Sequence, residues 1–244
     1  MFALLFTLLF TQNVWAFKIV LMDDTLKLDN GVVSTTATVV NDSTSMIAME
    51  AGVRVRSYSQ DGVENNDKIA QELIIIPSQM IISAGAEQVL NIRWVGPPSI
   101  ASEQAYRLLI EYVSVSEDKL KGLAPDEQQA MLNINYRVAK SFYVAPKGAK
   151  PQLQLQNAQK ITKDGKDMLR LSFDNIGNQH QVVGALDVRF PIEGGGHIDV
   201  SLKKEDFGNI INFLAHEKRD IDIVLPPSLQ DKNFQQPTIR GFGE

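Results

Sequence analysis

The sequence predicts an all-β protein built from two antiparallel β-sandwich domains in tandem. Two observations carry this prediction. Almost every apolar segment alternates with polar residues at period two, as strands do when they bury one face. Asp, Asn, Gly and Pro separate these segments at short intervals, which is typical of sandwiches. The chain of 244 residues is long enough for two such domains.

A short segment rich in Pro and Gly, residues 147–151, divides the strand candidates into two groups and predicts a linker. We therefore expect a first domain over residues 17–146 and a second over residues 152–244. Residues 117–129 interrupt the first group and predict a loop or a single helical turn. The strand candidates are residues 33–40, 47–55, 73–76, 90–94, 106–112 and 131–143, then 153–155, 168–173, 182–190, 197–202 and 221–225.

Residues 1–16 predict a secretory signal peptide. An apolar run from Phe2 to Phe10 is too short to cross a bilayer as a helix, and Val14, Trp15 and Ala16 end the segment in a pattern suited to cleavage. No Lys or Arg precedes the run, so the position of the natural start codon stays open. A buried strand or a membrane anchor is the alternative. We expect cleavage after Ala16 and an exported product.

Composition argues against several classes of function. A net charge of −5, with Lys and Arg scattered along the chain, does not favour binding to nucleic acid or to an anionic membrane. After residue 16 no apolar segment is long enough for a membrane span, so we expect no stable membrane insertion. The absence of cysteine removes thiol catalysis, thiolate metal sites and disulfides.

Histidines and glycines form no motif for a metal or a phosphate. His180, His197 and His216 are far apart and lack zinc-type spacing, so we interpret each as a surface or turn residue. Glycines 194–196 lie between two strand candidates and predict a turn, because a phosphate-binding loop would lead from a strand into a helix. We expect no metal and no cofactor.

Acidic residues leave an enzyme possible in principle but do not favour one. Asp23 with Asp24, or Glu64 with Asp67, could pair across a cleft as the carboxylates of glycosidases do. Charge on polar loops is the preferred interpretation of these residues. We therefore expect a protein that is not an enzyme.

The segment LNINYRVAKSFYVAP, residues 132–146, has an unusual charge on its apolar face. As an extended strand it would place Leu132, Ile134, Tyr136 and Val138 on one side. Lys140 falls on that same side. A buried ammonium group is costly without a partner, so this lysine requires an explanation.

Four stretches together resemble a known family. They are VVNDS (39–43), IIIPSQMIISAGAEQVLNIRW (74–94), YRLLIEY (106–112) and KSFYVAPKG (140–148). In this order and spacing they are similar to the N-terminal domain of periplasmic pilus-assembly chaperones of the PapD type. The resemblance covers the chain well from Phe17 to Lys150 and is weaker beyond. The fold that it implies is a pair of immunoglobulin-like sandwiches in a boomerang arrangement, with a cleft between them.

The resemblance also implies a function in pilus assembly. Members of this family work in the periplasm, where they bind pilus or fimbrial subunits, prevent their aggregation and deliver them to an outer-membrane usher. Each subunit lacks one strand, and the chaperone donates its own strand to fill the gap. Here the donor strand would be residues 131–143, with Leu132, Ile134, Tyr136 and Val138 as the side chains that enter the subunit. Neither enzymatic activity nor a cofactor is implied.

The resemblance assigns Lys140 to the position of a basic residue that binds the C-terminal carboxylate of the subunit. The best-known branch of the family has an arginine as second anchor, but Thr25 occupies that position here, with Lys27 two residues on. Arg107 follows a tyrosine at the start of a neighbouring strand, as in the divergent branches called archaic or alternative. We expect Lys140 and Arg107 to share the carboxylate, with Lys27 in reserve. The alternative is that Lys140 extends into solvent.

Two other functions fit the composition. An exported two-domain β protein could be an adhesin or could bind carbohydrate, although neither would need an apolar strand that ends in a basic residue. A secreted hydrolase with a carboxylate pair is the weaker alternative.

Overall fold

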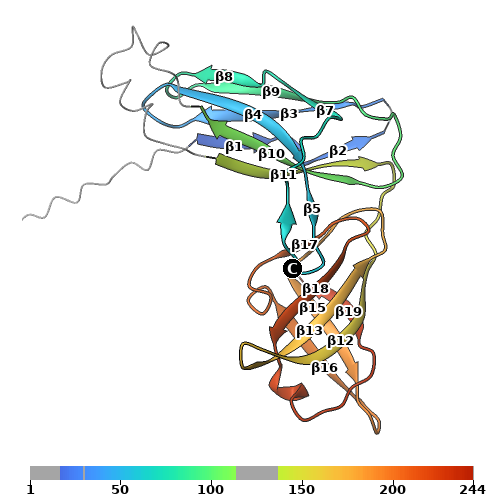
Figure 1. Ribbon diagram of the computed structural model, residues 1–244. Helices are drawn as coiled ribbons and strands as arrows, with labels where there is room; N and C mark the ends of the chain where they lie inside the picture. Colours follow the sequence, from blue (N-terminus) through green and yellow to red (C-terminus); the bar gives the residue numbers. More distant parts are fainter. Residues whose placement is uncertain (1–16, 30, 114–136, 244) are drawn as a thin grey trace, which may run out of the picture.

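The computed structural model describes residues 17–29, 31–113 and 137–243. Over these residues the chain forms two β-sandwiches, one from each half of the sequence (Figure 1). The predicted all-β class and the pair of sandwiches are confirmed. Three expected features lie outside the described residues: the signal peptide at 1–16, the loop at 117–129, and the donor residues Leu132, Ile134 and Tyr136.

The first sandwich packs a four-stranded sheet, in the order β1-β3-β9-β7, against a five-stranded sheet, in the order β2-β11-β10-β4-β8. Neighbouring strands are antiparallel except β2 and β11, which are parallel. The strands are β1 (Phe17–Leu21), β2 (Thr25–Leu28), β3 (Ser34–Asn41), β4 (Ile47–Val55), β5 (Ser57–Tyr58), β6 (Glu64–Asn65), β7 (Leu73–Ile76), β8 (Gln79–Ile82), β9 (Glu87–Trp94), β10 (Gln104–Tyr112) and β11 (Arg137–Pro146).

The N-terminal segment contributes to both sheets of the first sandwich. β1 pairs with β3 in one sheet, and after a crossing β2 pairs with β11 in the other, beginning at Thr25 opposite Tyr143. Two local hydrogen bonds hold the crossing: the backbone N–H of Thr25 donates to Asp23 Oδ1 (2.9 Å) and its hydroxyl donates to Asp24 Oδ1 (2.9 Å). Both carboxylates therefore stabilise this turn.

Alternation of side chains along the strands builds the core of the first sandwich. In β9, Leu90, Ile92 and Trp94 are buried, while the residues between them are exposed. β10 and β11 add Leu108 and Phe142, which are fully buried. Each large apolar side chain buried in this way stabilises the fold by about 1.5–3 kcal/mol. This core is formed within the first domain alone.

The second sandwich has a core of its own and consists of short sheets in the orders β12-β13-β18, β16-β15-β19 and β14-β17. The segment 182–190 was expected to be one strand but is divided at Gly184, because β14 pairs with β17 and β15 pairs with β16 and β19. The elements are β12 (Leu153–Lys163), β13 (Lys166–Asn175), β14 (Gln181–Val183), β15 (Ala185–Pro191), β16 (His197–Lys203), β17 (Ile211–Phe213), β18 (Lys218–Val224), the 3-10 helix η1 (Pro227–Leu229) and β19 (Thr238–Gly243).

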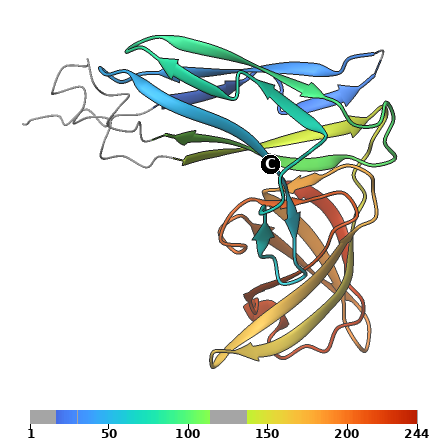
Figure 2. The same cartoon turned by 45° about the horizontal axis from the view of Figure 1, so that its top comes forward.

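The two sandwiches meet at an angle and give the molecule an L shape (Figure 1). A small hairpin, β5–β6, leaves the first sandwich at the end of β4 and reaches the second one. Both views place this hairpin in the inner corner of the L (Figure 2). Among the described strands, β5 and β6 pair only with each other. The sequence pattern did not predict the hairpin, because strands of two residues carry no periodicity.

An asparagine occupies an equivalent place in each domain. Asn41 ends β3 and Asn175 ends β13, and both are fully buried. In each case the side-chain amide cross-links a loop to a neighbouring strand end. Asn41 Nδ2 donates to the carbonyls of Ser45 (2.7 Å), Ile82 (3.0 Å) and Ser83 (3.0 Å), and Asn175 Nδ2 donates to those of Gln179 (2.8 Å) and Leu214 (2.8 Å).

Replacing either asparagine should destabilise the domain that contains it. We expect Asn41→Ala or Asn175→Ala to cost about 1–3 kcal/mol, because buried carbonyls would lose their donor. Urea unfolding followed by the fluorescence of Trp94, in the first core, reports the first domain, and circular dichroism reports both. Asn91→Ala, at an exposed position of β9, is the control. An unchanged Trp94 transition in Asn41→Ala would contradict this prediction.

Candidate functional site

β11 has a partly open edge in the described structure. On one side it pairs with β10 from Arg137 to Val144. On the other side its partner among the described strands is β2, which covers only Tyr143 to Pro146. The segment from Arg137 to Phe142 therefore has no described neighbour on that side. Such an edge is a template for an added strand.

The backbone groups that face this open side can be identified from the register. The N–H of Tyr143 donates to the carbonyl of Asp24 (2.8 Å), so Tyr143 directs its backbone groups away from β10. In an antiparallel pair this direction alternates from residue to residue. Ser141, Ala139 and Arg137 therefore also direct their N–H and C=O groups outward, where an added strand could pair with them.

Beside this edge, Arg107 binds a carboxylate of its own chain. Arg107 lies opposite Ser141 in the register, so both side chains leave the same face of the sheet. Its guanidinium group donates to both oxygens of Glu64, Nε to Oε1 (2.6 Å) and Nη2 to Oε2 (2.5 Å), in a bidentate arrangement. The remaining nitrogen, Nη1, donates to the hydroxyl of Ser141 (2.9 Å).

Arg56 is a second guanidinium group at the same carboxylate. Its Nε donates to Glu64 Oε2 (3.2 Å) and its Nη1 donates to the hydroxyl of Ser141 (3.2 Å). The side chain of Arg56 is only 4% exposed, whereas that of Glu64 is 22% exposed. We call Arg56 and Arg107 the arginine pair. Two buried or half-buried cations this close require an anion, and Glu64 supplies it.

The arginine pair keeps Glu64 ionised. Burial alone would raise the pKa of this carboxyl group, but the hydrogen bonds from Arg107 and Tyr58 and the charges of both arginines outweigh that effect. The result is a pKa of about 2, well below its ordinary value of 4.5. Glu64 therefore carries its negative charge at every physiological pH.

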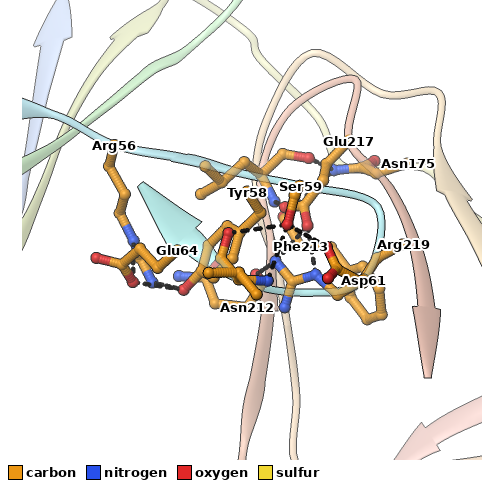
Figure 3. Close-up of polar contacts among 12 residues, drawn as sticks. Arg56, Tyr58, Ser59, Asp61, Glu64, Asn175, Asn212, Phe213, Glu217 and Arg219 are labelled. Carbon is orange, nitrogen blue, oxygen red and sulfur yellow. Dashed lines mark hydrogen bonds and ion pairs between the residues drawn. The ribbon is translucent and has the colours of Figure 1, made fainter. Parts of the chain in front are cut away.

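The β5–β6 hairpin that carries Glu64 contacts the second domain (Figure 3). The ring of Tyr58 lies under the guanidinium group of Arg219, 3.8 Å from ring centroid to Cζ. The backbone N–H of Asp220 donates to the carbonyl of Gln60 (2.9 Å). Arg219 is itself paired with buried Glu217. The hairpin thus connects the arginine pair to the second sandwich.

A second set of contacts between the domains surrounds Tyr143. Its ring stacks on that of His180, with centroids 4.0 Å apart, and its hydroxyl accepts from Arg56 Nη1 (3.1 Å) and Asn212 Nδ2 (2.5 Å). His180 Nδ1 lies 2.7 Å from Oε1 of buried Glu103. His180 lies in the loop between β13 and β14, as the turn interpretation expected, but its ring is half-buried between the domains and is not at the surface.

The other two histidines lie at the surface. His197 is exposed at the start of β16, and His216 is exposed in a turn with a φ of 58°. Glycines 194–196 also form a turn, with the N–H of Gly195 donating to the carbonyl of Ile192 (3.1 Å). Within residues 17–29, 31–113 and 137–243, no group of three or more metal-ligating side chains occurs. No helix within the same ranges could span a membrane.

The structure does not bring together the three basic residues expected at the anchor. β10 and β11 are antiparallel neighbours, and Lys140 lies opposite Leu108. Leu108 is in the core, so Lys140 and Arg107 leave opposite faces of the sheet. This register does not support a carboxylate shared by the two side chains, and the sharing stays a prediction.

Lys27 leaves the same face of the sheet as Arg107 but lies farther along the sheet than the carboxylate that Arg107 binds. It pairs with Ala145, four residues beyond Ser141, which is about 13 Å at the rise of a strand. Thr25 pairs with Tyr143 and likewise points away from the core. Both Lys27 and Lys140 are exposed. Of the expected anchors, Arg107 is the one that the structure places on a carboxylate.

Sequence reasoning missed Arg56 and Glu64. Arg56 was not singled out in the sequence, and Glu64 was interpreted as loop charge. Arg56 lies just beyond the end of β4, where the chain turns toward the second domain and its side chain becomes buried. No signal in the sequence distinguishes it from Arg54, which is less buried.

Solved structures match this chain over almost its whole length. A structure described as the class 5 fimbriae chaperone CfaA is 17% identical, with 93% of each chain covered and a TM-score of 0.56. A chain from a chaperone–tip adhesin complex of CFA/I fimbriae biogenesis is 18% identical, covering 92% of this chain and 93% of that chain, with a TM-score of 0.56. This protein has the fold of the fimbrial chaperones.

The match extends to a further solved structure, described as a chaperone. The YadV chaperone is 13% identical, covers 93% of this chain and 95% of that chain, and has a TM-score of 0.50. No protein-family model and no curated protein matches the sequence. Similarity at these levels of identity establishes the shared fold.

The low pKa of Glu64 predicts how its contribution to stability depends on pH. A carboxyl group with a lowered pKa stabilises the folded state above about pH 4.5 and loses this contribution as the pH falls toward 2. We expect the difference in urea midpoint between the wild type and Glu64→Gln to be smaller at pH 3 than at pH 6. Asp61→Asn, on the same hairpin, is the matched control. Equal differences at the two pH values would contradict the ion-pair interpretation.

Proposed function

We propose that the protein is a periplasmic chaperone that binds pilus or fimbrial subunits, prevents their aggregation and delivers them to an outer-membrane usher. The observation that carries this proposal is the open edge of β11, which ends beside the arginine pair. The shared fold with fimbrial chaperones supports the same function. The proposed function is not enzymatic and requires neither a metal nor a nucleotide.

The open edge of β11 supports donor-strand complementation as the proposed mode of binding. A subunit strand that adds to the open edge would pair with the outward backbone groups of Arg137, Ala139 and Ser141. Val138 packs against the core of the first domain. Every second residue before it would leave the strand on the same side, where the core of the subunit would extend the core of the first domain. In our proposal Leu132, Ile134 and Tyr136 supply these side chains. Each would contribute about 1.5–3 kcal/mol on burial.

The arginine pair would bind the end of the added strand. Such a strand must stop where β2 begins, at Tyr143, and this point is next to Ser141 and Arg107. If its last group is a carboxylate, the strand runs parallel to β11, as β2 does. We propose Arg107, together with Arg56, as the carboxylate anchor. Lys140 and Lys27 remain in the proposal only as basic residues that border the donor edge.

A proline at the open edge tests strand donation directly. Ala139→Pro removes an outward N–H without removing a bond to β10, so the domain should fold while its capture of a subunit fails. Ala139→Val, which keeps the N–H, is the matched control. The measurement is co-purification with subunits expressed from neighbouring reading frames. Equal recovery of the subunit with the proline variant would refute donation by this edge, and recovery of free protein in every case would favour an adhesin.

Separate replacement of the basic residues tests the anchor. We expect Arg107→Ala to weaken subunit capture by about tenfold or more, because a terminal carboxylate would lose a charge-assisted bidentate partner. Lys140→Ala should have a smaller effect, since its side chain leaves the other face of the sheet. Dissociation constants by calorimetry, with Trp94 fluorescence as a check on folding, decide the comparison. The reverse order of effects would return Lys140 to the anchor.

A further inference from the structure

The arginine pair already holds a ligand, and that ligand belongs to the protein itself. Glu64 accepts from Arg107 through both oxygens and from Arg56 through one of them. Tyr58 also donates to Glu64 Oε2 (2.7 Å). Any carboxylate could accept hydrogen bonds from this set of donors. The donors contact only the two oxygens and the negative charge of Glu64, and no other part of its side chain.

The element that carries Glu64 is weakly attached to the first sandwich. The β5–β6 hairpin has two residues in each strand and pairs with no other described strand. Isolated hairpins of this size are marginally stable in water. Its outer part is held by the second domain, through Tyr58 against Arg219 and Gln60 with Asp220. The hairpin can therefore leave the arginine pair without disrupting either core.

The same arginine pair lies at the end of the open edge of β11. Ser141, the last outward-facing residue before β2 begins, accepts a hydrogen bond from each arginine. A strand added to this edge would end next to Ser141, within the neighbourhood of the two arginines that bind Glu64. Two carboxylates at one such site would repel each other.

We propose that Glu64 is an internal substitute for the terminal carboxylate of a partner strand, and that binding of the partner displaces it and releases the β5–β6 hairpin. The proposal rests on the proposed function in one respect, since it takes the partner to be a strand added to β11. In the free protein Glu64 keeps the arginine pair ordered and neutralised. When a partner binds, the contact of the hairpin with the second domain loses its anchor in the first domain.

An internal ligand competes with an external one. The apparent affinity for the external ligand equals its intrinsic affinity multiplied by the fraction of molecules in which the site is free. Removing the charge of Glu64 should therefore strengthen binding of a carboxylate. A merely structural role would have the opposite effect, because the arginine pair would lose its order together with Glu64. The sign of the change thus distinguishes displacement from simple support.

The test compares full-length wild type with Glu64→Gln, and uses Asp61→Asn at the tip of the same hairpin as the control. The probes are a hexapeptide of alternating valine and threonine with a free C-terminal carboxylate and the same peptide as its C-terminal amide. Arginine Nε–H resonances followed by NMR give the dissociation constants. We expect Glu64→Gln to bind the carboxylate peptide about tenfold more tightly than wild type, with no gain for the amide and none for Asp61→Asn.

Equal or weaker binding of the carboxylate peptide by Glu64→Gln, or no binding by either protein, would overturn the proposal. Subunit co-purification separates this result from a failure of the proposed function. If the wild type captures a subunit and Glu64→Gln shows no gain, displacement is wrong and the chaperone function stands. If the wild type captures none while the peptide result holds, the carboxylate site stands without that function.

A measurement on the unmodified protein covers the case in which Glu64→Gln does not fold. The N–H of Ser59 donates to the carbonyl of Val63 (3.0 Å) within the hairpin. Saturation of the wild type with the carboxylate peptide should speed hydrogen exchange of this amide at least several-fold, because the hairpin loses its anchor. The amide peptide is the control. Unchanged exchange at saturation would contradict release of the hairpin.

Discussion

The structure depends on one constraint: a strand at the edge of a sheet must have its backbone groups paired, covered or left open for a partner. β2 satisfies this requirement for only the last part of β11, from Tyr143 onward. Its short length follows from the crossing at Asp23 and Asp24, since the preceding residues pair with β3 in the other sheet. The crossing therefore determines both where the edge is open and where an added strand would have to end.

The arginine pair connects this edge to the arrangement of the two domains. Arg56 contacts Glu64 on the hairpin and Tyr143 at the end of β11. Tyr143 contacts the second sandwich directly, and Glu64 is connected to it through Tyr58. A change of ligand at the arginines would thus alter the contact between the domains. The linker alone does not fix that contact, because side chains from both domains meet beside it.

Much of the fold followed from the sequence, because strands that bury one face show period two. β4, β9 and β10 were predicted for this reason, and the Pro- and Gly-rich segment after β11 separates two independent cores. The hairpin β5–β6 was missed because its strands are too short to have a pattern. The division of 182–190 at Gly184 was missed because it depends on which strands pair with each half.

The candidate site shows the same division between what a local sequence pattern predicts and what strand pairing decides. The sequence by itself determined that Arg107 and Lys140 lie in two separate strands of the first domain, and the resemblance made them candidate partners. Only the tertiary structure decided that Arg107 pairs with Ser141 and Lys140 with Leu108. A shift of one residue in a strand register moves every side chain to the other face, and alternation alone does not set the register between two strands. The meeting of Arg56, Glu64 and Arg107 was likewise decided by the folded chain, since these residues come from segments that no local pattern relates.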